Sequence, residues 1–206
     1  MLTYRKLTVV LAALLTAALA LPGPALAQFS EGYKFLEAVR KRNDKDVTEL
    51  LEKGGPSLIN TRDQTSLETG LHIATRQKNL AYVKFLIGQG ANANMRNKKG
   101  ETALVIACNL GFIEAVPVLI AAGARVDESS STGETPLITA VHNRNIALMR
   151  FLLQAGADPD RADNSGRTAR DYASLDAKRD ALLGEIKTSS KPKLKPGQGK
   201  PVFGPK

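Results

Sequence analysis

Residues 98–127 read KKGETALVIACNLGFIEAVPVLIAAGARVD, and residues 131–160 read STGETPLITAVHNRNIALMRFLLQAGADPD. The two stretches are copies of one pattern, offset by 33 positions. The same interval extends in both directions along the chain and relates four threonines: Thr69, Thr102, Thr135 and Thr168. Equally spaced anchors of this kind indicate a repeat array, in which similar structural units stack on one another.

The sequence after each threonine resembles the ankyrin repeat, a family known by a period of 33 residues and a T-P-L-H-x-A motif. The four local matches are TGLHIA at 69–74, TALVIA at 102–107, TPLITA at 135–140 and TARDYA at 168–173. No copy is perfect, but a Gly-Ala pair and rows of apolar residues recur with them. The resemblance covers residues 29–186 and implies an all-α solenoid of helix-turn-helix units joined by hairpin-like turns.

The residues of one unit support this interpretation independently. Threonine is a good N-cap because its hydroxyl accepts a hydrogen bond from a free backbone N–H, and Pro136 suits the first helical position. A second helix is predicted from about Asn145, with apolar residues at helical spacing, and Gly156 suits a left-handed cap at its end. Pro117 lies early in the second helix of its unit and predicts a late start or a mild kink there.

The ends of the array are predicted to be atypical, because a terminal unit has only one neighbour. Residues 29–60 form a degenerate first unit, and a short last unit ends the repeat domain at residue 186. We therefore predict a repeat domain at 28–186, with about five units. Residues 187–206 contain six lysines, four prolines and no acidic residue, which is the composition of a disordered basic tail.

Residues 1–27 have the layout of a secretory signal peptide. Arg5 and Lys6 precede an apolar run at 7–21, and Ala25-Leu26-Ala27 offers a cleavage site that would leave Gln28 first. The alternative is a retained membrane anchor, but this run is short against the roughly 20 residues of a membrane-spanning helix. We expect cleavage after Ala27 and a periplasmic or secreted protein.

The net charge of +9 says little about the repeat body. Of 29 basic residues, two lie in 1–27 and six in 187–206, which leaves 21 against 20 acidic residues. A nearly neutral body, together with export, disfavours nucleic-acid binding. One basic cluster, Arg96 with Lys98 and Lys99, lacks the glycine-rich loop of a phosphate site and is interpreted as a solvated turn.

No arrangement of residues predicts catalysis, a metal site or a cofactor. Two histidines and the single Cys108 do not match any standard zinc spacing, and no nucleophile elbow frames a serine. Cys108 is expected to be a small packed residue. His72 occupies the histidine position of the motif, where the resemblance implies a structural bridge between units, and His142 is expected to be exposed in the turn after the first helix of its unit.

The remaining function is recognition, because stacked repeats expose an extended surface. In ankyrin-like proteins the turn tips and first-helix surfaces contact partners. Carried over by position, the candidate partner-binding residues are Arg76, Gln77, Lys98, Lys99, Glu101, Asn109, Leu110, Ser131, Thr132, Glu134, His142, Asn143, Asn164, Ser165 and Arg167.

The resulting hypothesis is a monomeric, non-enzymatic module that binds or protects another exported protein through its concave face. An alternative hypothesis is an envelope-tethering factor whose basic tail binds anionic lipid or cell-wall polymer.

Overall fold

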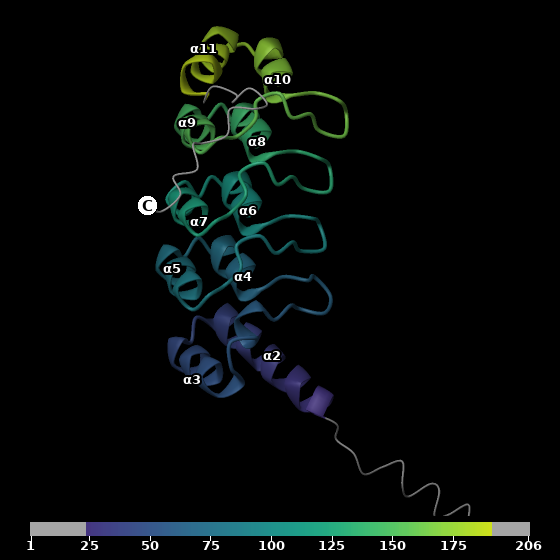
Figure 1. Cartoon of the computed structure of the whole chain (residues 1–206), viewed down its shortest axis with the longest axis vertical. Helices are drawn as coiled ribbons and strands as arrows, with labels where there is room; N and C mark the ends of the chain where they lie inside the picture. Colours follow the sequence, from purple (N-terminus) through teal and green to yellow (C-terminus); the bar gives the residue numbers. More distant parts are fainter. Residues whose placement is uncertain (1–23, 191–206) are drawn as a thin grey trace, which may run out of the picture.

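The computed structural model describes residues 24–190, which form a single stack of helix pairs (Figure 1). Within this range every regular element is helical, which confirms the predicted all-α solenoid. The first helices of the five units are α2 (Pro24–Lys41), α4 (Gly70–Arg76), α6 (Ala103–Asn109), α8 (Pro136–His142) and α10 (Ala169–Leu175). The second helices are α3 (Asp44–Gly54), α5 (Leu80–Gly88), α7 (Ala115–Ala121), α9 (Ile146–Gln154) and α11 (Arg179–Ser189).

The repeated threonines cap the first helices, as predicted. The hydroxyl oxygens of Thr102, Thr135 and Thr168 each accept a hydrogen bond from the backbone N–H three residues on, at 3.2–3.3 Å. Pro136 occupies the first turn of α8, where its missing N–H has no consequence. The local sequence therefore determines where each first helix begins.

The second helices begin in two ways. Asn79 and Asn145 cap α5 and α9 through their side-chain oxygens, at 3.1 and 3.0 Å. In the unit between them the equivalent residue is Phe112, which has no acceptor, and Pro117 follows. Helix α7 begins two positions later in the repeat than its neighbours, at Ala115, so the predicted late start is confirmed.

The turns between units are closed by one repeated polar position, occupied by Asp63, Asn97, Ser130 and Asp163. The side chain at this position accepts hydrogen bonds from backbone N–H groups of its own turn, such as those of Lys99 and Glu101 on Asn97 at 2.9 and 3.0 Å. Adjacent turns are also joined through the backbone. Ser131 N donates to Lys99 O at 2.9 Å and Asn164 N to Thr132 O at 3.2 Å.

Polar side chains also connect one unit to the next. The ring of His72 is buried; its Nδ1 accepts from the backbone N–H of Thr69 at 3.1 Å, and its Nε2 lies 3.1 Å from Glu101 O in the next unit. This is the predicted structural bridge, and burial lowers the pKa of His72. Asp127 acts similarly by accepting from the backbone N–H of Asp158 at 3.0 Å.

The core is a row of buried apolar residues that changes character at both ends. Leu86, Leu119 and Leu152 occupy one repeat position and are fully buried. The last unit has Glu185 there, paired with Arg150 at 2.8 Å. At the other end Asp46 replaces the buried residue that the next unit supplies as Tyr82. Both ends therefore carry polar caps, as expected for terminal units.

The edges of the described region adjoin the predicted domain boundaries. Helix α2 begins at Pro24, so its first residues overlap the end of the predicted leader, and the rest of that leader lies outside the described residues. Helix α11 continues to Ser189, beyond residue 186. The extra residues before the second unit form η2 (Leu58–Asn60), a 3₁₀ turn whose Leu58 and Ile59 are buried.

Gly133→Ala should lower the free energy of unfolding by about 2 kcal/mol, because a left-handed conformation costs a non-glycine residue roughly 1–2 kcal/mol and the space is filled. Gly133 has φ +80°, and an added Cβ would lie 2.6 Å from Asn164 N. Gly88→Ala is the matched control, since it lies at the end of α5 with open space around it. Urea denaturation that shows equal stability for the two variants would contradict this account.

Acid should weaken the turns. Hydrogen bonds from the backbone of Ser66 and from Arg40 lower the pKa of Asp63, and bonds from Ser165 and Tyr172 lower the pKa of Asp163. A carboxylate whose pKa is depressed in the folded state stabilises that state above its unfolded pKa of about 3.9, and this contribution is lost as pH falls further.

The double variant Asp63→Asn/Asp163→Asn should therefore be less stable than the parent at pH 7 and lose less stability between pH 5 and pH 2. Asp180→Asn is the control, because that side chain is 97% exposed. Denaturant titrations across this pH range test the expectation, and superimposable pH profiles for parent and double variant would refute it.

Candidate protein-binding face

The fifteen candidate residues lie on the surface formed by the first helices and the turns that precede them, which we call the inner face. None is buried, and Gln77, Glu101, Leu110 and Glu134 are half-buried. Adjacent units repeat the same positions along the stack (Figure 1), so the inner face consists of columns of side chains that cross the units. His142 is the last residue of α8 rather than part of the following turn, and it is exposed as expected.

A column of carboxylates runs along this face immediately before the capping threonines. It contains Glu68, Glu101 and Glu134, one per unit. Arg76 joins the first two, with its guanidinium 2.8 Å from Glu68 and 3.1 Å from Glu101 of the next unit. Partial burial opposes ionisation of Glu101, but hydrogen bonds from Asn97 and Arg76 outweigh it and hold the pKa of Glu101 below its usual value.

The column of polar contacts continues into the fourth unit through Thr139, which sequence reasoning did not select. Its hydroxyl lies 3.2 Å from Asn109 Oδ1 and 3.1 Å from Glu134 Oε1. His142 Nδ1 lies 3.1 Å from the same Glu134 oxygen. Cross-unit and intra-unit contacts thus hold most of the long side chains of the inner face in defined positions.

An aromatic group completes the inner face at its C-terminal end. The ring of Tyr172 lies edge-on to His142 with centroids 4.4 Å apart, and the guanidinium of Arg167 is 5.9 Å from its centre. The Tyr172 hydroxyl donates to Asp163 at 2.7 Å. Beside it Leu175 is 71% exposed, at the repeat position of Arg76, Asn109 and His142.

Tyr172 and Leu175 were absent from the predicted set, although the repeat alignment held a signal for both. Tyr172 occupies the position of two buried isoleucines, and Leu175 is an apolar residue in a polar column. These two side chains, with His142 and Arg167, form what we call the aromatic cluster. Tyrosine and arginine are enriched at binding hot spots, so the cluster is the part of the inner face best suited to anchor a partner.

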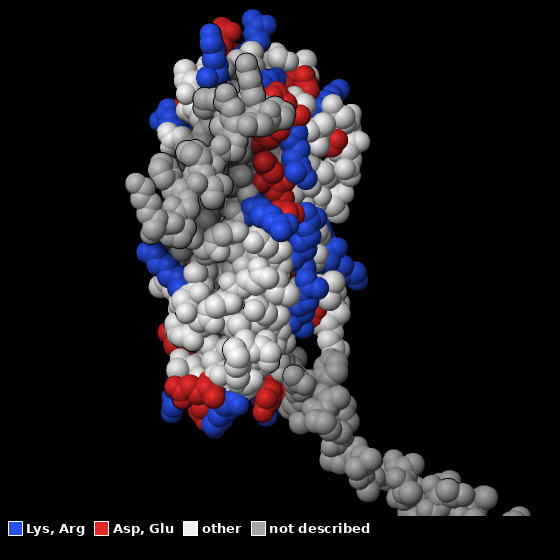
Figure 2. Space-filling view, in the orientation of Figure 1, with Lys and Arg blue, Asp and Glu red and all other residues white. Residues whose placement is uncertain are grey.

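Not every predicted residue remains available for a partner. The amide of Gln77 is used on both sides, donating to Arg40 O at 2.9 Å and accepting from Arg42 at 3.1 Å. In the basic cluster Arg96 pairs with Glu128, while Lys98 and Lys99 are exposed at a turn tip. Figure 2 shows cationic and anionic side chains intermixed along the stack, which disfavours recognition by net charge alone.

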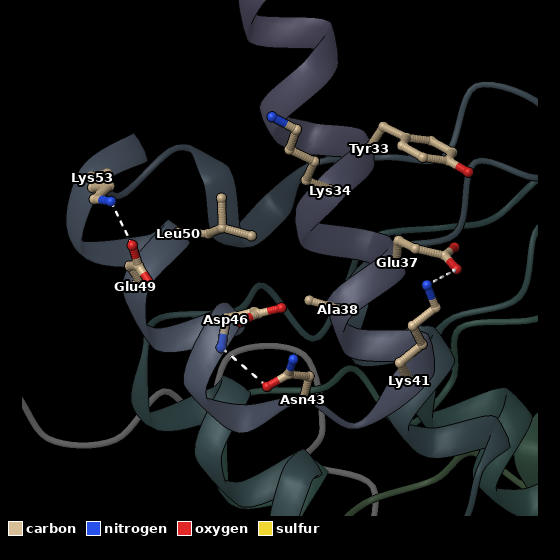
Figure 3. A pocket seen from close by; sticks show the side chains of 10 residues that line it. All are labelled: Tyr33, Lys34, Glu37, Ala38, Lys41, Asn43, Asp46, Glu49, Leu50 and Lys53. Carbon is tan, nitrogen blue, oxygen red and sulfur yellow. Dashed lines mark hydrogen bonds and ion pairs between the residues drawn. The ribbon is translucent and has the colours of Figure 1, made fainter.

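A groove of about 360 Å³ lies between α2 and α3 at the N-terminal end (Figure 3). Its apolar floor includes Ala38 and Leu50, and ion pairs such as Lys41–Glu37 at 3.3 Å lie along its rim. It occupies the place where an upstream unit would pack, so its polar rim is part of the N-terminal cap.

The chemistry of single residues gives no independent sign of catalysis. Cys108 is buried, and burial raises the pKa of its thiol to about 12, so the nucleophilic thiolate is scarce at neutral pH. Within residues 24–190, no group of three potential metal-ligating side chains comes together. In the same range no helix combines the length and apolar character needed to cross a membrane.

Comparison with known proteins agrees with this architecture. One family model of ankyrin repeats in three copies matches residues 35–130, and a second, of ankyrin repeats in many copies, matches residues 119–173. A probable E3 ubiquitin-protein ligase, XBOS33 of Oryza sativa subsp. japonica, is 33% identical over 89 residues, 43% of this chain and 17% of that protein. Alpha-latrotoxin-Lg1a of Latrodectus geometricus is 39% identical over 74 residues, 35% of this chain and 5% of the toxin.

This chain spans less than a fifth of either relative, so their shared feature is the repeat and not the whole protein. Ankyrin repeats are in general non-enzymatic modules for protein–protein interaction. The period, the capped helices, the stacked units and the two overlapping family matches lead to one assignment: the chain belongs to the ankyrin-repeat family.

Proposed function

We propose that this protein is a non-enzymatic module that holds another exported protein on its inner face. The observation that carries the proposal is the continuous set of contacts from Glu68 to Tyr172, which orders the side chains of four units before any partner arrives. Ordered side chains lose less conformational entropy on binding. The exposed Leu175 and the aromatic cluster then supply apolar and cation-compatible anchors at one end of this face.

Export is part of the proposal and is supported by the signal-like residues 1–27 and the cleavage pattern at 25–27. N-terminal sequencing of the protein from a bacterial envelope fraction should begin at Gln28. Recovery of the protein only with residue 1 still present, or only from the cytosol, would reject export without affecting the inner face.

The partner can be captured by a photo-crosslinking amino acid placed at one position at a time in intact cells. Labels at Asn143 and Leu175, both exposed on the inner face, should yield the same crosslinked protein. A label at Lys45, exposed on α3, is the matched control. Capture of one species equally from all three positions, or from Lys45 alone, would reject the inner face as the binding site.

Leu175→Ser should weaken binding of the captured partner by about tenfold or more, since burial of a leucine side chain is worth roughly 1.5–3 kcal/mol. Phe151→Ser is the control, because Phe151 is a large exposed apolar residue on a second helix. Calorimetric titration with the purified partner measures both, and an equal loss in the two variants would contradict an inner-face site.

Charge reversal tests the other end of the face. Lys98→Glu/Lys99→Glu combined with Glu134→Lys should weaken binding, while circular dichroism and the melting temperature stay close to those of the parent, because Lys98 and Lys99 are exposed turn residues. Lys45→Glu/Lys84→Glu changes two lysines on the second helices and should leave affinity unchanged. Partner binding that survives the first set intact would restrict the site to the aromatic cluster.

A further inference from the structure

The second helices of the three central units expose an unusually apolar surface. Each presents the same four positions outward, at helical spacing. Eight of the twelve positions hold small or apolar residues, and we call these the outer band: Ala81, Phe85, Gly88, Pro117, Val118, Ala121, Ala147 and Phe151. Phe151 is 44% exposed, and Phe85 and Val118 are half-buried beside it in one column.

The terminal helix α3 shows what an ordinary solvent-facing helix of this stack looks like. Its equivalent outward positions are Lys45, Thr48, Glu49 and Glu52, all exposed. Helix α7, by contrast, reads AVPVLIA and has no charged or hydrogen-bonding side chain. A helix that is apolar on every side is normally buried on every side. In Figure 2 charged side chains gather over α3, and the surface over α5 and α7 is largely uncharged.

A second copy of the chain is a poor occupant for the outer band. Three helices of nine residues or fewer, at about 9 Å spacing and 1.5 Å per residue, offer roughly 350–400 Å². A standard interface needs about 800 Å² per partner. Two-fold pairing about α7 would also bring Lys84 of one copy toward Arg150 of the other, which are like charges.

The chain itself supplies a segment of suitable length and origin. Helix α11 packs on α9 and ends at Ser189, so residues 191–206 begin beside the outer band. Their sequence, KPKLKPGQGKPVFGPK, contains three large apolar residues: Leu194, Val202 and Phe203. Proline-rich chains extend by about 3.1 Å per residue, so Leu194 can reach about 12 Å and Phe203 about 40 Å from Ser190.

These distances match the spacing of the helices. At about 9 Å per helix, α9 lies one step from α11, α7 two steps and α5 three steps, or roughly 27 Å. We propose that residues 191–206 lie across the outer band, with Leu194 over α9 and Val202 and Phe203 over α7 and α5. Binding within one chain benefits from an effective concentration in the millimolar range, so a contact of modest area is sufficient.

The charges beside the band are compatible with this lysine-rich segment. Arg150 is already paired with Glu185 through two hydrogen bonds, at 3.0 and 2.8 Å, which reduces its repulsion of the lysines. Glu114 is exposed at the start of α7 and offers a carboxylate beside the band. The basic segment therefore meets only one uncompensated cation on the three helices, Lys84, within the described residues.

The test uses the full chain with a photo-crosslinking amino acid in place of Phe203. Irradiation of dilute protein should give intramolecular crosslinks to α5 or α7, identified by mass spectrometry. Val118→Lys should lower the crosslink yield about tenfold, since one buried apolar contact is worth roughly 1.4 kcal/mol. Leu175→Lys introduces the same charge on the inner face and should leave the yield unchanged.

A second measurement does not depend on the folding of the Val118 variant. A chain ending at Ser190, and separately Phe203→Ser in the full chain, should bind more of an apolar fluorescent dye than the parent does. Crosslinks that fall elsewhere on the stack, or that appear only between two molecules as concentration rises, would overturn the proposal. Dye binding unchanged in both altered chains would do the same and would assign the band to another protein.

Discussion

Each unit of this stack depends on burial of its apolar helix faces against the neighbouring units. Two short helices of seven to nine residues cannot enclose a core, and helices of that length are only marginally stable in isolation. The row of Leu86, Leu119 and Leu152 shows the solution, because each side chain is fully buried between adjacent units. Where the row ends, the same position changes to Glu185, and stacking stops.

Polar contacts set the register of the stack that apolar burial holds together. Apolar surfaces slide easily, whereas the ring of His72 reaches one particular carbonyl oxygen, that of Glu101, in the next unit. Backbone hydrogen bonds between successive turns act in the same direction. On the inner face the carboxylate column extends this arrangement to the surface, so the contacts that align the units also order the side chains offered to a partner.

The two long faces of the molecule are therefore chemically different. The inner face is polar, internally bonded and ends in the aromatic cluster, which suits selective recognition. The outer band is apolar and has few polar groups to orient a partner, which suits coverage by a simple segment close at hand. This contrast follows from the repeat itself, because each unit places its first helix toward one face and its second helix toward the other (Figure 1).

The sequence by itself determined the period, the helix starts and the end caps, because these depend on residues within a few positions of one another. The threonine and asparagine caps, the late start of α7 after Phe112 and the bridge at His72 were all readable from local pattern or family resemblance. The tertiary structure decided which exposed residues act together. Thr139 meets Asn109 from 30 residues away, and Tyr172 joins His142 across a unit boundary. Such pairings arise only when the units stack, since a periodic sequence specifies which positions are equivalent and not which side chains come within contact distance.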